Sequence, residues 1–485
     1  MKKLRSLFSF FQKPQFILIL ILAVFLFKGV FLATVYPIFS GQDEARHYNT
    51  IQYISSPHVQ NSQKIKRQVK GKNKDFSRYN FSQEIINAGK ASGLDSFRHG
   101  IYNTTNFSPG YMGKNETTID SANWEPLNYY YPPDVSSQTL YHSLGSWIEK
   151  TFATSNILVR FYLIRIFSVL LGTLAVFLTY LIAKNSGFSQ KNSLLLTAIV
   201  AFQPKFAMYF TNINYDALLI PMFFLFTLSG VLMLKNGLNW KNLSLMILSV
   251  IIAMYAKGTG IILLAMSVFL ISYILYEKLR RQKKSFRYGF YALAFLAVIF
   301  LFEYFKKYLP LSGSFLSTSQ SLIKYLDKSL TMGRFSHSSR TYWGALTWVN
   351  NFFLQKNPEI IRFIETFSAI GLVLFLFSKK QFSNLPKKKF VLFFLAMVAA
   401  LQLGIRAYDW NVYTHSRSLV LGTPGRYFLP NLASHIILVF VGLGALFEVF
   451  KKEKYLKYSL IAGFLLMFCF SFYIIFNTIV LRFYL

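Results

Sequence analysis

The sequence predicts an all-α polytopic membrane protein with about 11 membrane-spanning helices and a large first loop that contains short helices. Three observations predict this fold class. Hydrophobic residues make up 53% of the 485-residue chain, and the mean hydropathy is +0.37. The apolar residues gather in runs of about 20, which is the length that crosses a bilayer as a helix. Short clusters of Lys and Arg separate these runs.

The first predicted span covers residues 16–36 and follows Lys2, Lys3, Arg5 and Lys13. Its apolar run is longer than the core of a secretory signal, and no small-residue cleavage site follows it. We therefore expect this segment to remain as a helix. The basic residues before it place the N-terminus in the cytoplasm, because positive charge is retained on that side.

The later apolar runs predict the remaining spans. They lie near residues 161–183, 193–211, 216–234, 242–256, 259–276, 288–305, 359–378, 390–405, 430–450 and 458–481. This count places every interior basic cluster on the same side as the N-terminus. The clusters lie near residues 184–191, 235–241, 278–287, 379–389 and 451–457.

The opposite side receives one long loop, 37–155, and two shorter ones, 303–358 and 406–429, within a single membrane domain, 1–485. Ten of the 19 acidic residues of the chain lie in the long loop. Chemistry that needs carboxylates is therefore expected on the extracytoplasmic face of an integral plasma (inner) membrane protein.

Composition also excludes several classes. The net charge of +33 comes from short clusters between apolar runs, and this pattern indicates membrane topology and contact with anionic lipid rather than nucleic-acid binding. The chain has a single cysteine, Cys469. A single cysteine excludes an intrachain disulfide and any cysteine-based zinc site.

Two adjacent acids and a histidine follow the first span, at Asp43, Glu44 and His47. If a helix begins after Gly41, the spacing allows all three side chains to face one site. Repulsion between adjacent carboxylates raises the pKa of one of them, which suits one acid to general-base catalysis and the other to orienting a partner or a cation. The alternative is a helix N-terminus at which the acids favour the helix dipole. Binding of a divalent cation by these three side chains is an open alternative, and the sequence predicts no set of metal ligands.

The acidic motif after the first helix, the large first outer loop and the number of spans resemble the GT-C superfamily of membrane glycosyltransferases. Residues 42–47 are similar to the Pro-Asp-Glu-x-x-His element of DUF2142, a bacterial family of predicted membrane proteins of unknown function. Residues 340–348 resemble the Phe-Trp-Gly-x-Phe-Gly-Trp element of that family, and residues 425–430 resemble its Gly-Arg-Tyr-x-x-Pro element. The departures are Gln42 in place of proline and the pair Leu346 and Thr347 in place of an aromatic residue and glycine.

The resemblance implies inverting transfer of a sugar from a polyprenyl-phosphate donor to a cell-surface glycan, lipid or polymer acceptor. It implies Asp43 or Glu44 as the general base, with His47 orienting one of them or contacting the leaving phosphate. Outer-face cations would hold the phosphate, and aromatic side chains would contact the sugar or the prenyl chain. The candidate substrate-binding residues are Arg426, Arg340, Arg417, Lys257, Lys205, Trp343, Tyr427, Trp124 and Glu125.

Several of these residues have a structural alternative. Lys205 and Lys257 lie at predicted span ends, where lysine commonly reaches toward lipid headgroups. Trp343, and the aromatic and proline-rich stretch that holds Trp124, suit an interfacial belt as well as a sugar groove. Asp216 begins a span and is interpreted as a helix cap.

Two other functional classes stay open. A transporter or flippase of lipid-linked sugars is disfavoured because no internal repeat is evident and the polar residues concentrate on one face. A polymerase or ligase of surface polysaccharide is disfavoured because the long loop comes first in this chain. A non-catalytic scaffold is the remaining alternative.

Overall fold

The structure is a computed structural model, and part of the chain can be described from it. The described residues are 14–55, 81–91, 94–96, 101–102, 138–279, 315–343, 359–379, 382, 385–416, 424–452 and 454–476. Trp124, Glu125, Arg417 and the predicted span 288–305 lie outside the described residues.

The regular secondary structure of the described residues is helical apart from one antiparallel strand pair, β1 (Leu94–Ser96) and β2 (Ile101–Tyr102). The helices are α2 (Pro14–Val35), α3 (Glu44–Ser55), α4 (Gln83–Ala91), α6 (Leu140–Thr151), α7 (Ile157–Ser186), α8 (Gln190–Phe202), α9 (Pro204–Tyr209), α10 (Asp216–Asn236), α11 (Trp240–Ala256), η2 (Gly258–Gly260), α12 (Ile261–Leu279), α14 (Phe315–Thr331), α15 (Arg334–Trp343), α17 (Glu359–Phe377), α18 (Lys388–Ser416), η3 (Gly425–Asn431), α19 (Leu432–Val449) and α20 (Lys454–Ile474). This helical composition agrees with the predicted fold class.

Within the described residues, seven helices are long and apolar enough to cross a membrane. They are α2, α7, α10, η2 with α12, α18, η3 with α19, and α20. The sequence predicted about eleven spans. Of the other four, 242–256 forms α11, which has 17 residues, and 359–378 forms α17, whose first two turns carry Glu359, Arg362 and Glu365.

The predicted span 193–211 is two helices rather than one, and Pro204 is the reason. Proline lacks a backbone N–H and disfavours helical geometry in the residue before it. Gln203 accordingly has φ −61° and ψ 118°, and α9 starts anew at Pro204. The Gln203 side chain donates from Nε2 to the carbonyl of Tyr342 at 2.9 Å, so the break also ties α9 to α15.

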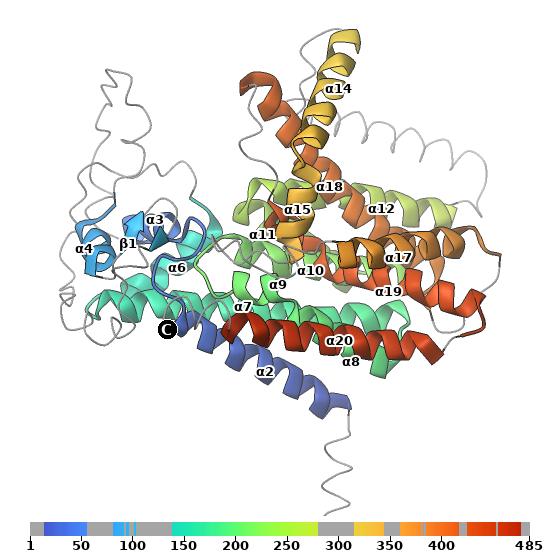
Figure 1. Cartoon of the computed structure of the whole chain (residues 1–485), viewed down its shortest axis with the longest axis horizontal. Helices are drawn as coiled ribbons and strands as arrows, with labels where there is room; N and C mark the ends of the chain where they lie inside the picture. The colour runs from blue at the N-terminus through green and yellow to red at the C-terminus, as the bar shows by residue number, and fades with distance from the viewer. Residues whose placement is uncertain are drawn as a thin grey trace, which may run out of the picture.

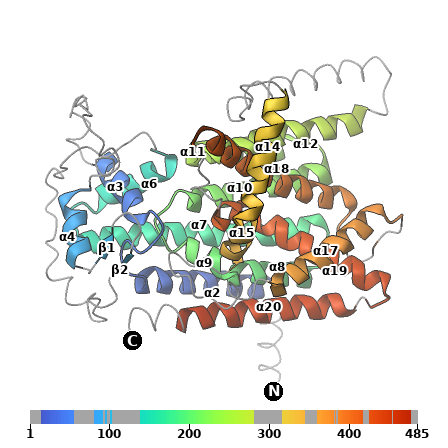
Figure 2. The same cartoon turned by 45° about the horizontal axis from the view of Figure 1, so that its top comes forward.

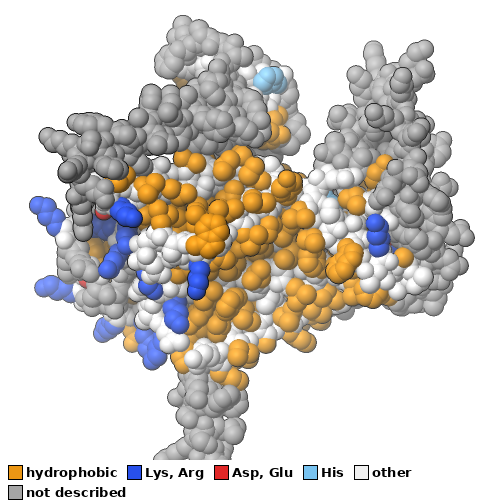
Figure 3. Space-filling model, turned by 180° about the vertical axis from the view of Figure 1, so that it is seen from behind, with side chains coloured by type: hydrophobic (Ala, Val, Ile, Leu, Met, Phe, Trp, Pro, Cys, Tyr) orange, Lys and Arg blue, Asp and Glu red, His pale blue; other side chains and the backbone are white. Residues whose placement is uncertain are grey.

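The long helices run side by side, while α3, α4, α6 and β1 gather at one end of them (Figures 1 and 2). The face of the molecule that is hidden in Figure 1 carries a broad band of hydrophobic side chains (Figure 3). Lys and Arg gather at the end of this band that lies away from α3, α4 and α6. Large apolar side chains such as Phe27 and Leu403 are 74% and 70% exposed, as expected for a surface that faces lipid.

A buried polar network fastens the short helices to α7. Arg160 of α7 forms ion pairs with Glu84 of α4 and Glu149 of α6. Tyr48 of α3 donates to both carboxylate oxygens of Glu149 at 3.1 Å, and Gln52 donates to Glu84 at 2.7 Å. Because α4 and α6 bind Arg160 directly and α3 binds the same two carboxylates, the network fixes this end of the molecule relative to α7.

Candidate functional site at the end of α2

The segment 36–43 links α2 to α3 through an unusual backbone. Phe39 has φ 62° and Asp43 has φ 58°, in the left-handed region that bulky side chains rarely adopt and that Asp tolerates better. The ring of Phe39 is buried and packs edge-on against Phe161, with ring centroids 5.1 Å apart. Tertiary packing therefore holds a conformation that the local sequence would not favour.

Arg165 of α7 organises this segment. Its guanidinium has five N–H donors, and two of them bind Glu44, from Nε to Oε1 at 2.8 Å and from Nη2 to Oε2 at 2.7 Å. The others bind carbonyl oxygens at 2.6 to 2.9 Å. These carbonyls belong to Ala33, Tyr36 and Pro37. Arg165 therefore holds the end of α2 and the start of α3 together.

Glu44 is fully committed to this structure. Its side chain is 0% exposed, and its two oxygens also accept from the backbone N–H of Ile213 at 2.9 Å and of Gly41 at 3.0 Å. Because each carboxylate oxygen has two donors, Glu44 is satisfied by the protein itself. Ile213 lies between α9 and α10, so Glu44 also binds this connection to the end of α2 and the start of α3.

Asp43 faces different surroundings from its neighbour. Its side chain is 39% exposed, and Oδ2 lies 3.3 Å from Nη2 of Arg426. Arg426 also donates to the side-chain oxygen of Gln42. Arg426 comes from η3, 383 residues later in the chain. The structure thus brings the acidic motif and the Gly-Arg-Tyr motif together, and it parts Asp43 from Glu44.

A second ion pair lies beside Arg426. Lys257 Nζ donates to both oxygens of Asp216, at 2.8 and 3.1 Å, and the hydroxyl of Tyr209 donates to the same carboxylate at 2.9 Å. The ammonium lies 4.4 Å from the ring centroid of Tyr427, the residue after Arg426. Asp216, interpreted from sequence as a helix cap, is therefore the counter-ion of Lys257.

Positive charge exceeds negative charge at this place. Lys205 of α9 is 4% exposed, and its Nζ lies 6.0 Å from the ring centroid of Tyr209. Arg426 and Lys257 each have one carboxylate partner, Asp43 and Asp216. The pairs cancel, and Lys205 has no carboxylate partner among the described residues, so these five side chains carry a surplus positive charge when Lys205 is protonated. An anion is the natural complement of such a surplus.

His47 is paired with His142, which the sequence did not predict. His47 Nδ1 lies 3.0 Å from Nε2 of His142, and His142 Nδ1 accepts from the backbone N–H of Thr139 at 3.2 Å. A backbone N–H can only donate, so His142 carries its proton on Nε2 and donates it to His47. Burial, together with the positive charges of Arg46, Arg426 and Lys257, lowers the pKa of His47 to about 3.

We expect the His47–His142 pair to destabilise the protein in acid. The pKa of His47 falls from 6.5 to about 3 on folding, so the unfolded chain binds the proton first. The pair's contribution to the free energy of unfolding is complete above about pH 6.5. Below that pH it is lost progressively, at about 1.4 kcal/mol per pH unit and site. At about pH 5 His47 alone accounts for a loss of about 2 kcal/mol. Thermal unfolding of the purified protein across this range measures the loss.

The matched control is His142→Gln, in which the amide nitrogen can still donate to His47. This variant has one buried imidazole fewer, and we expect it to lose less stability between about pH 7.5 and about pH 5. Burial raises the pKa of Glu149 to about 7, an effect of opposite sign that is common to both proteins and cancels in the comparison. Identical pH dependence in the two proteins would contradict the assignment.

The remaining predicted residues lie elsewhere. Arg340 is exposed on α15. Trp343, at the end of α15, is buried and donates to Glu365 at 3.2 Å. Within the described ranges, no group of three or more His, Cys, Asp or Glu side chains is placed to hold a metal ion.

Sequence reasoning missed the residues that support the site. Arg165 lies inside the apolar run 161–183, and a charge inside a predicted span is itself a signal of function or pairing. His142 and Tyr209 carried no such signal, because neither stands in a recognisable motif.

The family assignment follows from the sequence as a whole. The profile of the DUF2142 family, described as predicted membrane proteins, matches residues 25–435. The chain belongs to the DUF2142 family. The match begins within α2 and ends within α19, so the DUF2142 region includes both Asp43 and Arg426. The predicted resemblance to DUF2142 is thereby confirmed. No curated protein matches the chain.

Proposed function

We propose that this DUF2142 protein is a GT-C-type glycosyltransferase. It moves a sugar from a polyprenyl-phosphate donor to a glycan or lipid acceptor on the extracytoplasmic face of the membrane. The observation that carries the proposal is the contrast between Asp43 and Glu44. One carboxylate is accessible and lies among cations, and the other is buried and saturated with donors.

Asp43 has the properties of a general base. A base needs a free lone pair within reach of the acceptor hydroxyl, and the Asp43 carboxylate is part-exposed with one ion-pair partner, Arg426. Glu44 has no such capacity because Arg165 and two backbone N–H groups bind its oxygens. In this proposal Glu44 positions Asp43, since the two are adjacent at the start of α3.

The cations suit the phosphate of the donor. Arg426 has an Nε that lacks a hydrogen-bond partner among the described residues, and Lys205 brings the surplus charge. Guanidinium and ammonium groups are the usual ligands of phosphate oxygens. Tyr427, between Arg426 and Lys257, offers an aromatic face to the sugar or the prenyl chain.

The reaction that follows is a single displacement. The acceptor oxygen attacks the anomeric carbon, its proton passes to Asp43, and the bond from that carbon to the phosphate oxygen breaks. The polyprenyl phosphate leaves with its electron pair, and Arg426, Lys257 and Lys205 stabilise the added charge. Attack opposite the leaving group inverts the anomeric configuration.

The proposal includes an orientation in the membrane. Lys235 of α10 donates to Asn185 of α7 at 3.1 Å, and Lys389 of α18 donates to the carbonyl of Leu234, so basic residues of two helices meet at the end of α10 opposite Asp216. Positive charge on the cytoplasmic side then puts the Asp43 site outside the cell. We also retain about eleven spans for the whole chain, with α8–α9, α11, α17 and 288–305 added to the seven.

We expect Arg426→Ala to weaken binding of the polyprenyl-phosphate donor by roughly 10- to 100-fold, the effect of losing a charge-assisted hydrogen bond. Acceptor binding should change far less. Titration of the protein in nanodiscs with donor and with acceptor measures the two effects separately. Arg426→Lys keeps the charge and loses the planar fork, so we expect an intermediate donor affinity.

Lys235→Ala is the matched control, because it removes one positive charge at the opposite end of α10. We expect it to bind donor as tightly as the unmodified protein. Equal losses of donor and acceptor affinity in Arg426→Ala would show that Arg426 supports the structure and does not hold the phosphate.

A further inference from the structure

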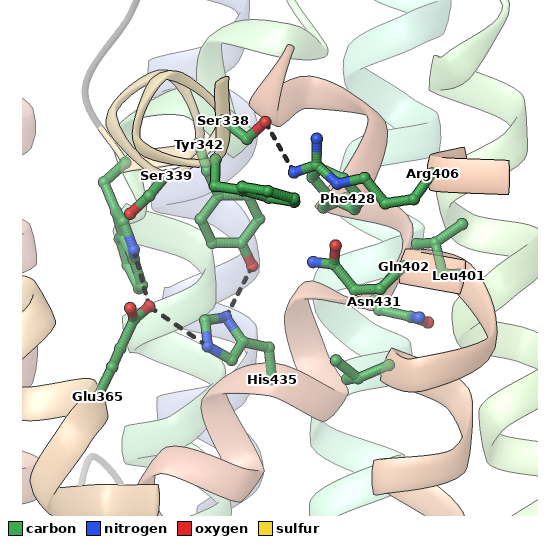
Figure 4. A pocket seen from close by; sticks show the side chains of 13 residues that line it. Ser338, Ser339, Tyr342, Glu365, Leu401, Gln402, Arg406, Phe428, Asn431 and His435 are labelled. Atoms are coloured by element: carbon green, nitrogen blue, oxygen red, sulfur yellow. Dashed lines mark hydrogen bonds and ion pairs between the residues drawn. The ribbon is translucent and has the colours of Figure 1, made fainter. Parts of the chain in front are cut away.

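A cavity of about 410 Å³ lies on the other side of η3 from Asp43. Residues of α15, α17, α18, η3 and α19 line it (Figure 4). Volumes of this order are typical of small-molecule sites in proteins. None of its polar residues belongs to the Asp43 site.

The helix η3 separates the cavity from that site. A 3-10 helix has three residues per turn, so residues three apart share a face. Phe428 and Asn431 both line the cavity, and Gly425, three residues earlier, packs on α15. A β-carbon at Gly425 would lie 2.1 Å from the backbone nitrogen of Tyr342. Arg426 lies on a different face and meets Asp43, so the two places are distinct.

One wall of the cavity is a chain of hydrogen-bonding groups (Figure 4). Trp343 Nε1 donates to Glu365 Oε1 at 3.2 Å, His435 Nε2 lies 3.5 Å from the same oxygen, and His435 Nδ1 lies 3.1 Å from the hydroxyl of Tyr342. The Glu365 side chain is 32% exposed. Within the described residues its second oxygen has no hydrogen-bond partner, so this wall offers a strong acceptor.

The opposite wall carries a cation that the protein already satisfies. Arg406 Nη2 donates to the Ser338 hydroxyl at 3.0 Å. Its guanidinium lies 4.6 Å from the ring centroid of Phe335 and 5.4 Å from that of Phe428. Asp409, one turn further along α18, adds negative charge beside it. The wall therefore offers aromatic faces more than free positive charge.

These features select one class of ligand. A carboxylate brings no donor for Glu365, and both a carboxylate and a phosphate are repelled by its negative charge. An ammonium is repelled by Arg406 across the cavity. A purely apolar chain would leave the polar wall unsatisfied. A neutral sugar has hydroxyls that donate to Glu365 and exchange hydrogen bonds with Gln402, and it has C–H faces that pack on aromatic rings.

We infer that this cavity binds one ring of a neutral sugar, at a site separate from the Asp43 site. The inference does not depend on the transfer reaction. The test uses full-length protein in nanodiscs, without glycoside detergents. The probes are glucose, galactose, mannose and N-acetylglucosamine, with inorganic phosphate and ethanolamine for comparison, and saturation-transfer NMR measures their binding.

We expect at least one of the four sugars to bind. Trp343→Leu should weaken that binding at least about tenfold, the effect of losing one good contact. Gln402→Leu should do the same and changes an exposed side chain, so it remains informative if Trp343→Leu fails to fold. Asp43→Asn should leave the affinity unchanged.

Three results would overturn the inference. They are binding of none of the four sugars, preferential binding of phosphate or ethanolamine, and sugar binding that Asp43→Asn weakens while Gln402→Leu does not. The third result would place the sugar at the Asp43 site alone. Proposed transfer activity can fail while this binding is observed, and the reverse also holds, so the two proposals are tested separately.

Discussion

Arg165→Met is expected to destabilise the protein by at least about 3 to 5 kcal/mol, the usual effect of removing one partner of a buried ion pair. Glu44 would keep its charge at 0% exposure without its counter-ion. The carbonyls of Ala33, Tyr36 and Pro37 would lose their donors as well. We expect a large fall in the thermal unfolding temperature and in the yield of folded protein.

Two variants calibrate this result. Arg165→Lys keeps a charge but cannot reproduce five planar donors, so we expect an intermediate loss. Adding Glu44→Gln to Arg165→Met removes the stranded charge, and the double variant should be more stable than the sum of the single effects predicts. An unfolding temperature of Arg165→Met equal to that of the unmodified protein would refute the role of this pair.

Asp43→Asn is expected to lower sugar transfer by at least about 100-fold, the usual contribution of a general base. The amide has nearly the same shape and cannot accept the proton. Asn also tolerates the left-handed backbone that Asp43 adopts, so the fold should be retained. Single-turnover transfer with saturating donor measures the effect on the chemical step.

Glu44→Gln is the matched control for the neighbouring acid. It removes a charge one residue away, but in the buried pair with Arg165. We expect its main effect on the unfolding temperature, whereas Asp43→Asn should change the rate and leave the unfolding temperature near that of the unmodified protein. The opposite pattern would exchange the roles that we propose for the two acids.

The sequence singled out two residues that the structure brings together, but it did not predict the contacts that hold them. Asp43 was singled out because it belongs to the acid pair that follows the first span, and Arg426 because its motif resembles an element of DUF2142. The structure brings the two side chains to 3.3 Å. Their contact itself could not be derived from periodicity, since it joins positions 383 residues apart. Helical spacing allowed Asp43, Glu44 and His47 to share one site. In the structure each has its own partner.

The reason is tertiary pairing. Arg165 satisfies Glu44, and His142 satisfies His47, and neither partner is near in sequence. The charge at 165 inside an apolar run was a usable signal, although it could not reveal which acid it would meet. Lys257 is similar: a lysine at a span end suggests contact with headgroups, whereas Asp216 binds it in the structure.

Hydropathy predicted the seven long apolar helices. It was less accurate where a proline or a group of charged residues lies within an apolar run. Pro204 divides 193–211 into α8 and α9, although the run is apolar throughout most of its length. The predicted span 359–378 is the helix α17, but its first two turns carry Glu359, Arg362 and Glu365, and Glu365 accepts a hydrogen bond from Trp343. At such positions a proline or a charged residue does not match the apolar sequence around it. Its role becomes clear only from its contacts with distant parts of the fold.

The most direct test of the central claim is sugar transfer by the purified protein in liposomes, with a panel of radiolabelled polyprenyl-phosphate sugars as donors. We expect the unmodified protein to transfer at least one sugar with inversion. We expect Asp43→Asn to bind the same donor and to transfer its sugar at least about 100-fold more slowly. Transfer by Asp43→Asn at the unmodified rate, or no transfer from any donor of the panel, would refute the proposed function.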